Sequence, residues 1–409
     1  MPGHRTRRST GRTVAPLCAL IALITAVSPA LASAAPSIPA GEWPLDGAHF
    51  NAVQIWPLSR GAGVTVAVVD SGVDAAHPDL AGQVIAGTSL LGDGGDGRSD
   101  TSSDSHGTAI AGLIAGTGRS DHGKGIIGLA PAATIMPIRV TAGAQVTAPI
   151  LAQGITWAAE HGAKVINVSM TTSDPDPLLR QAVAYALRQD AVVIAAAGNN
   201  GTSGNAVMYP AGFPGVVSVS GSDQNGRFWA TSESGPDVTV AAPAQGIDSI
   251  NDQGQYVQAD GTSYATAYVS ATAALIRARY PHLTAAQVIR RIISTTQPHA
   301  TKPSPELGYG EINPMTALTA PLDSMSTANP LLTLPTTSKP ATTIPALLAI
   351  AVGGLLVLAT GTIFILRRKR RSHAAISAPK TGAVRQVPRP AGSSSKAKSK
   401  TAQRPKARS

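Results

Sequence analysis

Cysteine is almost absent from this sequence, since Cys18 is the only one among 409 residues. It lies near the N-terminus, where four arginines precede an apolar run from Val14 to Leu31 and the small residues Ala32-Ser33-Ala34 follow. This pattern predicts a secretory signal peptide over residues 1–34. Reading Arg7-Arg8 as a twin-arginine signal is an alternative that the residues after the pair do not support. The mature chain would hold no disulfide and no thiol nucleophile, which excludes a cysteine protease.

The 23 residues from Ile344 to Leu366, near the other end of the chain, include no charged residue. At about 1.5 Å per residue, a helix of this length crosses a hydrocarbon core about 30 Å thick. Five basic residues follow at 367–371, and the positive-inside rule places them in the cytoplasm. We therefore predict one transmembrane helix over residues 344–366, with the preceding region on the extracytoplasmic side of the cell membrane. A buried core helix is the alternative, but such helices are rarely charge-free and bounded by five basic residues.

Acidic residues are missing from residues 367–409, which contain 14 Lys or Arg. With few large apolar residues this tail cannot bury a core, so we expect it to be disordered in the cytoplasm. We expect it to lie against anionic lipid, with a protein or nucleic-acid partner as the alternative. The net charge of +10 therefore reflects the two ends of the chain, and residues 35–366 carry −8. A nucleic-acid-binding ectodomain is disfavoured by this acidity.

Aromatic residues make up 4% of the chain, and its central part is instead rich in Val, Ile and Ala. Short apolar runs there predict buried strands of a mostly parallel sheet. These runs are Val64–Val69, Thr134–Val140, Lys164–Ser169, Ala191–Ala196 and Val216–Ser220. Helical patterns alternate with them at Thr108–Ala115, Pro149–His161, Leu178–Gln189, Ser263–Tyr280 and from Thr284, where Thr284 and Gln287 form a capping box. The alternation predicts a three-layer α/β domain.

The domain is predicted to span residues 43–318, after a short N-terminal extension at residues 35–42. Residues 319–343 are rich in Pro, Thr and Ser and predict an extended linker between the domain and the membrane helix.

A serine in a glycine turn is the most informative feature of the central region, in Gly261-Thr262-Ser263-Tyr264-Ala265. A hydroxyl becomes a nucleophile when an imidazole removes its proton and a carboxylate orients that imidazole. Asp70 ends an apolar strand, where α/β sheets place their sites, and His106 begins a helical run. Each residue taken alone is more often a turn or cap residue. Together, Asp70, His106 and Ser263 form a serine-hydrolase constellation.

Asn199 adds a fourth element, because Ala196-Ala197-Gly198-Asn199 closes another apolar strand with a side-chain amide. Acyl transfer needs a donor aimed at the developing oxyanion, and Asn199 suits that role beside the backbone N–H of Ser263. A turn-forming asparagine is the alternative.

The four blocks resemble those of the subtilase family. Asp70-Ser71-Gly72 with His77-Pro78-Asp79-Leu80 is similar to the aspartate block, and His106-Gly107-Thr108 to the histidine block. The resemblance implies a subtilisin-like fold, serine endopeptidase activity, the triad Asp70, His106 and Ser263, and Asn199 as oxyanion donor. It also implies that a peptide binds as an added strand along Ser169, Met170 and Thr171. The alternative is that Ser169 and Met170 simply end a core strand.

Two positions depart from the family's pattern. Ala267 stands where subtilases usually have proline, four residues after the serine, so we expect slightly looser positioning of the helix start. Thr171 stands where many members have glycine, so we expect a narrower cleft and selective processing.

The exported domain, membrane helix and basic tail resemble the mycosins, membrane-anchored proteases of type VII secretion systems. This resemblance implies a protein or peptide substrate and membrane components of such a system as partners. Two alternatives stay open: a mainly structural subunit of a secretion complex, and a general surface protease.

Metal binding is not expected. Four acids, Asp93, Asp96, Asp100 and Asp104, lie in a Gly/Ser-rich loop that could bind a cation. They match no recognised calcium-loop pattern, and a solvated acidic loop explains them. We therefore expect no cofactor, although structural calcium is common in the family.

Overall fold

The computed structural model describes residues 1, 3–4, 38–39, 41–120, 125–143, 145–322 and 326–332. The predicted signal peptide, membrane span and cytoplasmic tail lie outside these residues, apart from three at the N-terminus. Within the described part, no helix combines the length and the apolar character needed to cross a membrane.

Seven parallel strands form the central sheet, in the order β2-β3-β1-β4-β5-β6-β7. Their bounds are β1 Thr65–Asp70, β2 Thr88–Ser89, β3 Thr134–Arg139, β4 Val165–Val168, β5 Val192–Ala196, β6 Val217–Ser222 and β7 Val240–Pro243. The five predicted strands correspond to β1, β3, β4, β5 and β6. β2 and β7 were not predicted. β8 Ile247–Ile250 and β9 Tyr256–Ala259 form a separate antiparallel hairpin.

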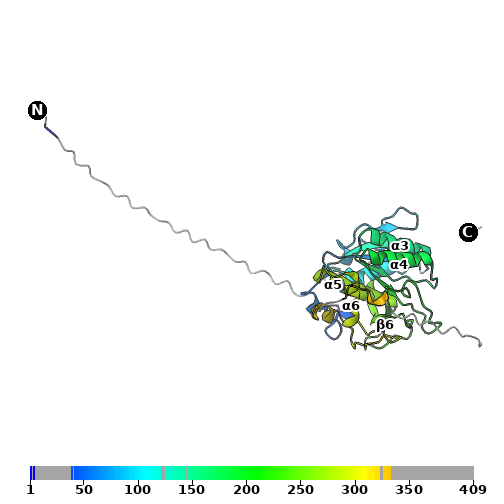
Figure 1. Cartoon of the computed structure of the whole chain (residues 1–409). Helices are drawn as coiled ribbons and strands as arrows, with labels where there is room; N and C mark the ends of the chain where they lie inside the picture. Colours follow the sequence, from blue (N-terminus) through cyan, green and yellow to red (C-terminus); the bar gives the residue numbers. More distant parts are fainter. Residues whose placement is uncertain are drawn as a thin grey trace, which may run out of the picture. The chain divides into compact units, whose positions relative to one another are not determined.

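Helices cover both faces of the sheet. They are α1 Ala52–Ile55, α2 His106–Ala115, α3 Ala148–Glu160, α4 Pro177–Arg188, α5 Thr262–Arg279, α6 Ala285–Ser294 and α7 Pro314–Thr319. Short 3-10 helices occur at η1 Trp43–Leu45, η2 Pro78–Leu80 and η4 Pro330–Leu332. Figure 1 shows α3 and α4 together on one side of the domain and α5 and α6 on the other. The capping box at Thr284 is present at the start of α6.

The period-two alternation of strand side chains explains the three layers. Val66 and Val68 of β1 pack with α2 and α5 in one apolar cluster. Ala67 and Val69 of the same strand pack with α3 and α4 in a second cluster on the opposite face. Since strands buried on both faces are mostly apolar, the Val and Ile runs of β1 and β5 are accounted for, whereas β6 also buries Ser218, Ser220 and Ser222.

A buried carboxyl anchors the N-terminal end of the domain. Glu42 is 2% exposed, and its Oε1 accepts a hydrogen bond from the backbone N–H of Ile127 at 2.9 Å. Burial raises the pKa of Glu42 to about 9, aided by the nearby charges of Asp79 and Asp248 and opposed by the Ile127 bond. Glu42 is therefore neutral in the folded protein at pH 7.

Residues 326–332, which the sequence analysis placed in the linker, contact the domain. Leu331 is 2% exposed in the core, and the Asn329 side chain donates to the carbonyl of Gly215 at 3.4 Å. Arg290 of α6 donates to the carbonyl of Ala328 at 3.2 Å. The segment 326–332 therefore packs against the domain.

Candidate active site

Asp70 and His106 meet at the carboxyl end of the sheet. Asp70 is the last residue of β1 and is fully buried, and His106 is the first residue of α2. Nδ1 of His106 lies 2.7 Å from Oδ1 of Asp70, which also accepts the backbone N–H of Ser71 at 2.8 Å. Because a carboxylate can only accept, Nδ1 carries the hydrogen. In the neutral ring, Nε2 is then left with its lone pair, as a general base requires.

The start of α2 is fixed by hydrogen bonds that the sequence did not reveal. Ser71 Oγ accepts the backbone N–H of Gly107 at 2.9 Å. Oδ2 of Asp100 accepts both the backbone N–H and the hydroxyl of Thr108, at 3.0 and 2.8 Å. A Cβ on Gly107 would lie 2.0 Å from the carbonyl oxygen of Gly72, so only glycine allows this close approach. These contacts hold the ring of His106 against Asp70.

Ser263 lies in the first turn of α5 and is 6% exposed. Its hydroxyl donates to the backbone carbonyl of Ser169, just beyond β4, at 3.1 Å. The Ser169 hydroxyl in turn donates to the carbonyl of Ser263 at 3.3 Å. To act as a nucleophile with His106 as its base, the Ser263 hydroxyl would have to turn away from Ser169. Catalytic hydrogen bonds commonly tighten only when substrate is bound.

Asn199 is oriented by the residue before the serine. Its Oδ1 accepts the backbone N–H of Thr262 at 2.9 Å and the Thr262 hydroxyl at 2.8 Å. Since both partners donate, the network fixes which end of the amide is oxygen. The NH₂ group therefore remains available to a negative oxygen in the cavity, beside the N-terminus of α5, whose dipole also favours negative charge.

The charge of Asp70 controls the titration of His106. Burial by itself lowers the pKa of His106, but the hydrogen-bonded Asp70 carboxylate opposes this, assisted by Asp104 and Asp100. The pKa of His106 therefore lies above its ordinary value.

One cavity brings the sequence-predicted residues together. It has a volume of about 220 Å³ and is lined by Asp70, Ser71, Asp104, His106, Gly143, Ser169, Met170, Thr171, Asn199 and Ser263. From the sequence, Asp104 is expected only as part of a possible cation loop, and Ser71 and Gly143 have no expected role. Ser71 follows Asp70 directly, which was the one available signal for its place here.

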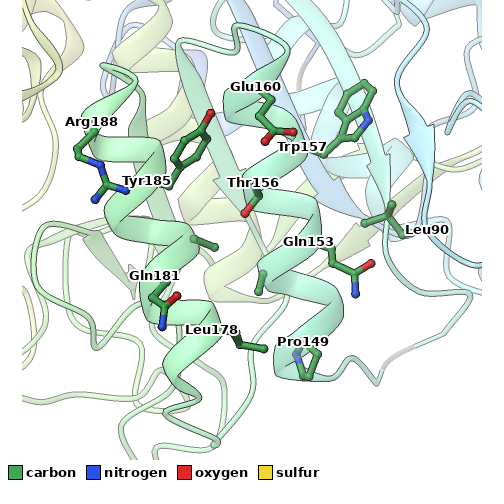
Figure 2. Close-up of a pocket in the computed structure, with 12 residues that line it drawn as sticks. Leu90, Pro149, Gln153, Thr156, Trp157, Glu160, Leu178, Gln181, Tyr185 and Arg188 are labelled. Atoms are coloured by element: carbon green, nitrogen blue, oxygen red, sulfur yellow. The ribbon is translucent and has the colours of Figure 1, made fainter.

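A larger groove of about 600 Å³ lies elsewhere, between α3 and α4 (Figure 2). Trp157, Tyr185 and Leu178 line it, and none of the four candidate catalytic side chains does. This groove is therefore separate from the proposed chemistry.

The acids of the Gly/Ser-rich loop mostly have partners within the chain. Asp93 pairs with Arg139 at 2.7 Å, and Asp96 with Arg98 at 2.6 Å. Asp100 is occupied by Thr108 as described. Among the described residues, no group of three His, Cys, Asp or Glu could hold a metal ion.

Ala267, the position that lacks proline, is fully buried in an uninterrupted α5. The first turns of this helix are reinforced by the Thr266 hydroxyl, which donates to the carbonyl of Thr262 at 2.7 Å. The looser positioning expected from alanine stays a prediction.

Comparisons with known proteins agree with this architecture. The model of the subtilase family, Peptidase_S8, matches residues 61–311. Mycosin-3 of Mycobacterium tuberculosis is 33% identical over 396 residues, covering 78% of this chain and 83% of that relative. Subtilisin DY of Bacillus licheniformis is 36% identical over 240 residues, covering 58% of this chain and 84% of that relative.

Solved structures give the same result. MycP1 from Mycobacterium smegmatis has a TM-score of 0.64 at 30% identity, covering 74% of this chain and 89% of that one. The MycP3 protease from the type VII (ESX-3) secretion system has a TM-score of 0.60 at 34% identity, covering 70% and 89%. The predicted resemblance to subtilases, and among them to mycosins, is confirmed, and the chain belongs to the subtilase family of serine proteases.

Proposed function

We propose that this chain is a membrane-anchored, extracytoplasmic serine endopeptidase in which Asp70, His106 and Ser263 form the catalytic triad. The observation that carries the proposal is the single cavity lined by these three residues and Asn199. The 2.7 Å contact between His106 and Asp70 supports the orienting role of the carboxylate.

In the proposed reaction, Oγ of Ser263 attacks the scissile carbonyl carbon while Nε2 of His106 takes the hydroxyl proton. The carbonyl oxygen becomes negative and is held by the Asn199 amide and the backbone N–H of Ser263. His106 then gives its proton to the leaving amine, which breaks the peptide bond and leaves an acyl ester on Ser263. Water, activated by His106, hydrolyses the ester and restores the hydroxyl.

The substrate is proposed to bind in extended form along Ser169, Met170 and Thr171. All three line the cavity, and the reciprocal hydrogen bonds of Ser169 and Ser263 tie this segment to the nucleophile. Thr171 is proposed to narrow the cleft and make cleavage selective.

The experiment uses the full chain, exported to a membrane fraction and solubilised in detergent. A fluorophosphonate probe should label the wild type and not Ser263→Ala, and fluorogenic peptides should be cleaved only by the wild type. A folded wild-type protein that neither labels nor cleaves any peptide of a diverse library would overturn the proposal.

The cellular role is proposed to be that of a mycosin in type VII secretion, with membrane components of that system as partners. The likeness to MycP3, which is described as part of the ESX-3 system, supports this role. One solved relative is described as an essential component of its secretion system, which favours a structural role as a second candidate. Complementing a deletion strain with Ser263→Ala separates the two: restored secretion would make the structural role primary, and failed secretion would make proteolysis primary.

A single membrane helix over residues 344–366 is proposed to anchor the domain, with the signal peptide removed. Protease digestion of intact cells should remove the catalytic domain and spare an epitope placed after residue 371. Digestion of that epitope from outside would reverse the proposed topology.

A further inference from the structure

The turn that carries Asn199 is held from two sides. Gly198, the residue before it, has a φ of 116°, a conformation that favours glycine. On one side its backbone N–H donates to the hydroxyl of Thr262, next to the nucleophile, at 3.3 Å. On the other side its carbonyl accepts the backbone N–H of Glu233 at 2.9 Å. The direction of the Asn199 side chain therefore depends on both contacts.

The side chain of Glu233 lies directly against this turn. Glu233 is 3% exposed, and a Cβ on Gly198 would collide with its Oε2 and with Cγ of Met208. The carboxyl of Glu233 accepts the backbone N–H of Ala206, at the far end of the loop that follows Asn199. Oε2 has no hydrogen-bond partner among the described residues. The side chain therefore fills the space behind Gly198 and contacts both ends of one loop.

The residues on either side of Glu233 are fixed to the same loop. The backbone N–H of Gly201 donates to the carbonyl of Thr231 at 2.9 Å. Oδ1 of Asn205 accepts the backbone N–H of Ser234 at 2.6 Å. Because these contacts tie the two segments together, a change in the space that the carboxyl of Glu233 needs must shift the turn beside it.

The protonation state of Glu233 decides how well its side chain fits there. Burial raises the pKa of Glu233 to about 7, the charge of Asp237 acts in the same direction, and the bond from Ala206 opposes them. Apart from Glu233 itself, residues 198–208 and 229–236 contain no ionisable group. At low pH the neutral carboxyl fits against Gly198. As pH rises through 7, the carboxylate needs a donor for Oε2 that the packed turn does not offer.

We propose that Glu233 is a positioning residue of the oxyanion site: its buried side chain holds the turn at Gly198 and thereby aims the Asn199 amide at the developing oxyanion. Glu233 does not line the cavity, so it acts through Asn199 and not on the substrate. Ionisation of Glu233 should therefore lower kcat and leave KM unchanged. This inference rests on the proposed endopeptidase function, because it assigns a support to the oxyanion donor of that reaction.

Glu233→Gln keeps the shape of the side chain and stays neutral at every pH, so its comparison with the wild type isolates the ionisation. Loss of an oxyanion donor lowers kcat by about 10²–10³, and a misplaced donor loses part of this. The kcat of Glu233→Gln should equal that of the wild type at pH 6 and exceed it about tenfold at pH 8.5. The midpoint should lie near the pKa of Glu233, at about 7. Titration of His106 is common to both proteins and cancels in the ratio.

The test measures kcat and KM on a fluorogenic peptide from pH 6 to pH 8.5, with the full chain in detergent and Tm recorded on each preparation. The matched control is Glu311→Gln. Burial also raises the pKa of Glu311, and its Oε2 has no partner among the described residues, but Glu311 does not line the cavity. The kcat of this control relative to the wild type should stay constant with pH.

A second background separates positioning from a general effect of charge. Asn199→Ala has no amide to aim, so adding Glu233→Gln to it should produce no pH-dependent gain in kcat. Glu233→Ala, which removes the side chain from behind Gly198, should lower kcat already at pH 6, where Glu233→Gln does not. If Glu233→Ala does not fold, the Glu233→Gln series decides by itself.

A ratio of Glu233→Gln to wild type that stays flat from pH 6 to pH 8.5 overturns the inference, as does an equal rise in Glu311→Gln. A rise that survives in the Asn199→Ala background also overturns it, because the charge of Glu233 would then act without the amide. These results differ from failure of the proposed function, in which the folded wild type cleaves no peptide at any pH.

Discussion

The side chain of Asn199 has two roles, and different substitutions can separate them. Its Oδ1 holds the backbone N–H and hydroxyl of Thr262, directly before the serine, while its NH₂ is proposed to stabilise the oxyanion. Asn199→Ala removes both tasks. Asn199→Asp keeps two acceptor oxygens for Thr262 and removes only the amide donor.

The two losses have different sizes. Removing one oxyanion donor lowers kcat by about 10²–10³, or roughly 3–4 kcal/mol in the transition state. Leaving the N–H of Thr262 without its partner destabilises the fold by about 1–3 kcal/mol, because Thr262 is fully buried. For a domain of this size that corresponds to a fall in Tm of roughly 5 °C. A typical domain would still be folded at 25 °C, so the loss of activity would not be due to unfolding.

The assay is kcat and KM on a fluorogenic peptide at 25 °C, with Tm measured on the same preparations. Asn199→Ala should lose both activity and thermal stability. Asn199→Asp should lose at least as much activity, since its carboxylate repels the oxyanion, and keep most of its stability near pH 7. Folded Asn199→Ala with kcat within threefold of the wild type would refute the oxyanion role. Equal loss of Tm in the two variants would refute the anchoring role of Oδ1.

Two further predictions follow from titrating groups. Because the base must be neutral and Asp70 raises the pKa of His106, kcat/KM should rise with pH with a midpoint above the ordinary value of 6.5. Asp70→Asn should move that midpoint down and lower kcat by about 10⁴; an unmoved midpoint in a pH–rate profile would contradict this. Glu42 has a folded pKa raised to about 9 from 4.5, so folding takes up a proton between these pH values and its contribution to stability is lost as pH rises. Glu42→Gln should therefore gain in Tm relative to wild type from pH 5 to pH 9, and a constant difference across that range would refute the assignment.

The parts of the fold that the sequence predicted are those whose signal is local. β1 and β5 are apolar runs buried on both faces, β4 is an apolar run interrupted only by Asn167, and α6 opens with a capping box. β2 has only two residues, Thr88 and Ser89, and both are half-buried, so it carries no periodic signal. β7 is a short run ending in proline at the sheet's edge, where pairing decides the conformation. β7 pairs with its neighbour β6. No local sequence pattern reveals this strand pairing.

The candidate site was predictable to the extent that it lies in strand ends and glycine turns. The sequence placed Asp70, His106, Asn199 and Ser263, and the structure brings all four to one cavity. The contacts that fix them join residues far apart in the chain, such as Ser105 with Asp252 and Asn199 with Thr262. A hydrogen bond between distant residues leaves no periodicity, so only the folded chain reveals it.

The sequence separations between hydrogen-bonded residues of the site also affect when activity first appears during folding. Asp70 and His106 are 36 residues apart, Asn199 and Thr262 are 63, and Ser169 and Ser263 are 94. Contacts of such range close late and slow the folding of a chain. A nascent chain that has not yet added α5 to the sheet lacks the nucleophile and the oxyanion site together. A domain with the proposed activity can therefore begin to cut peptides only after its own folding is nearly complete, which limits damage to itself and to its neighbours while it folds.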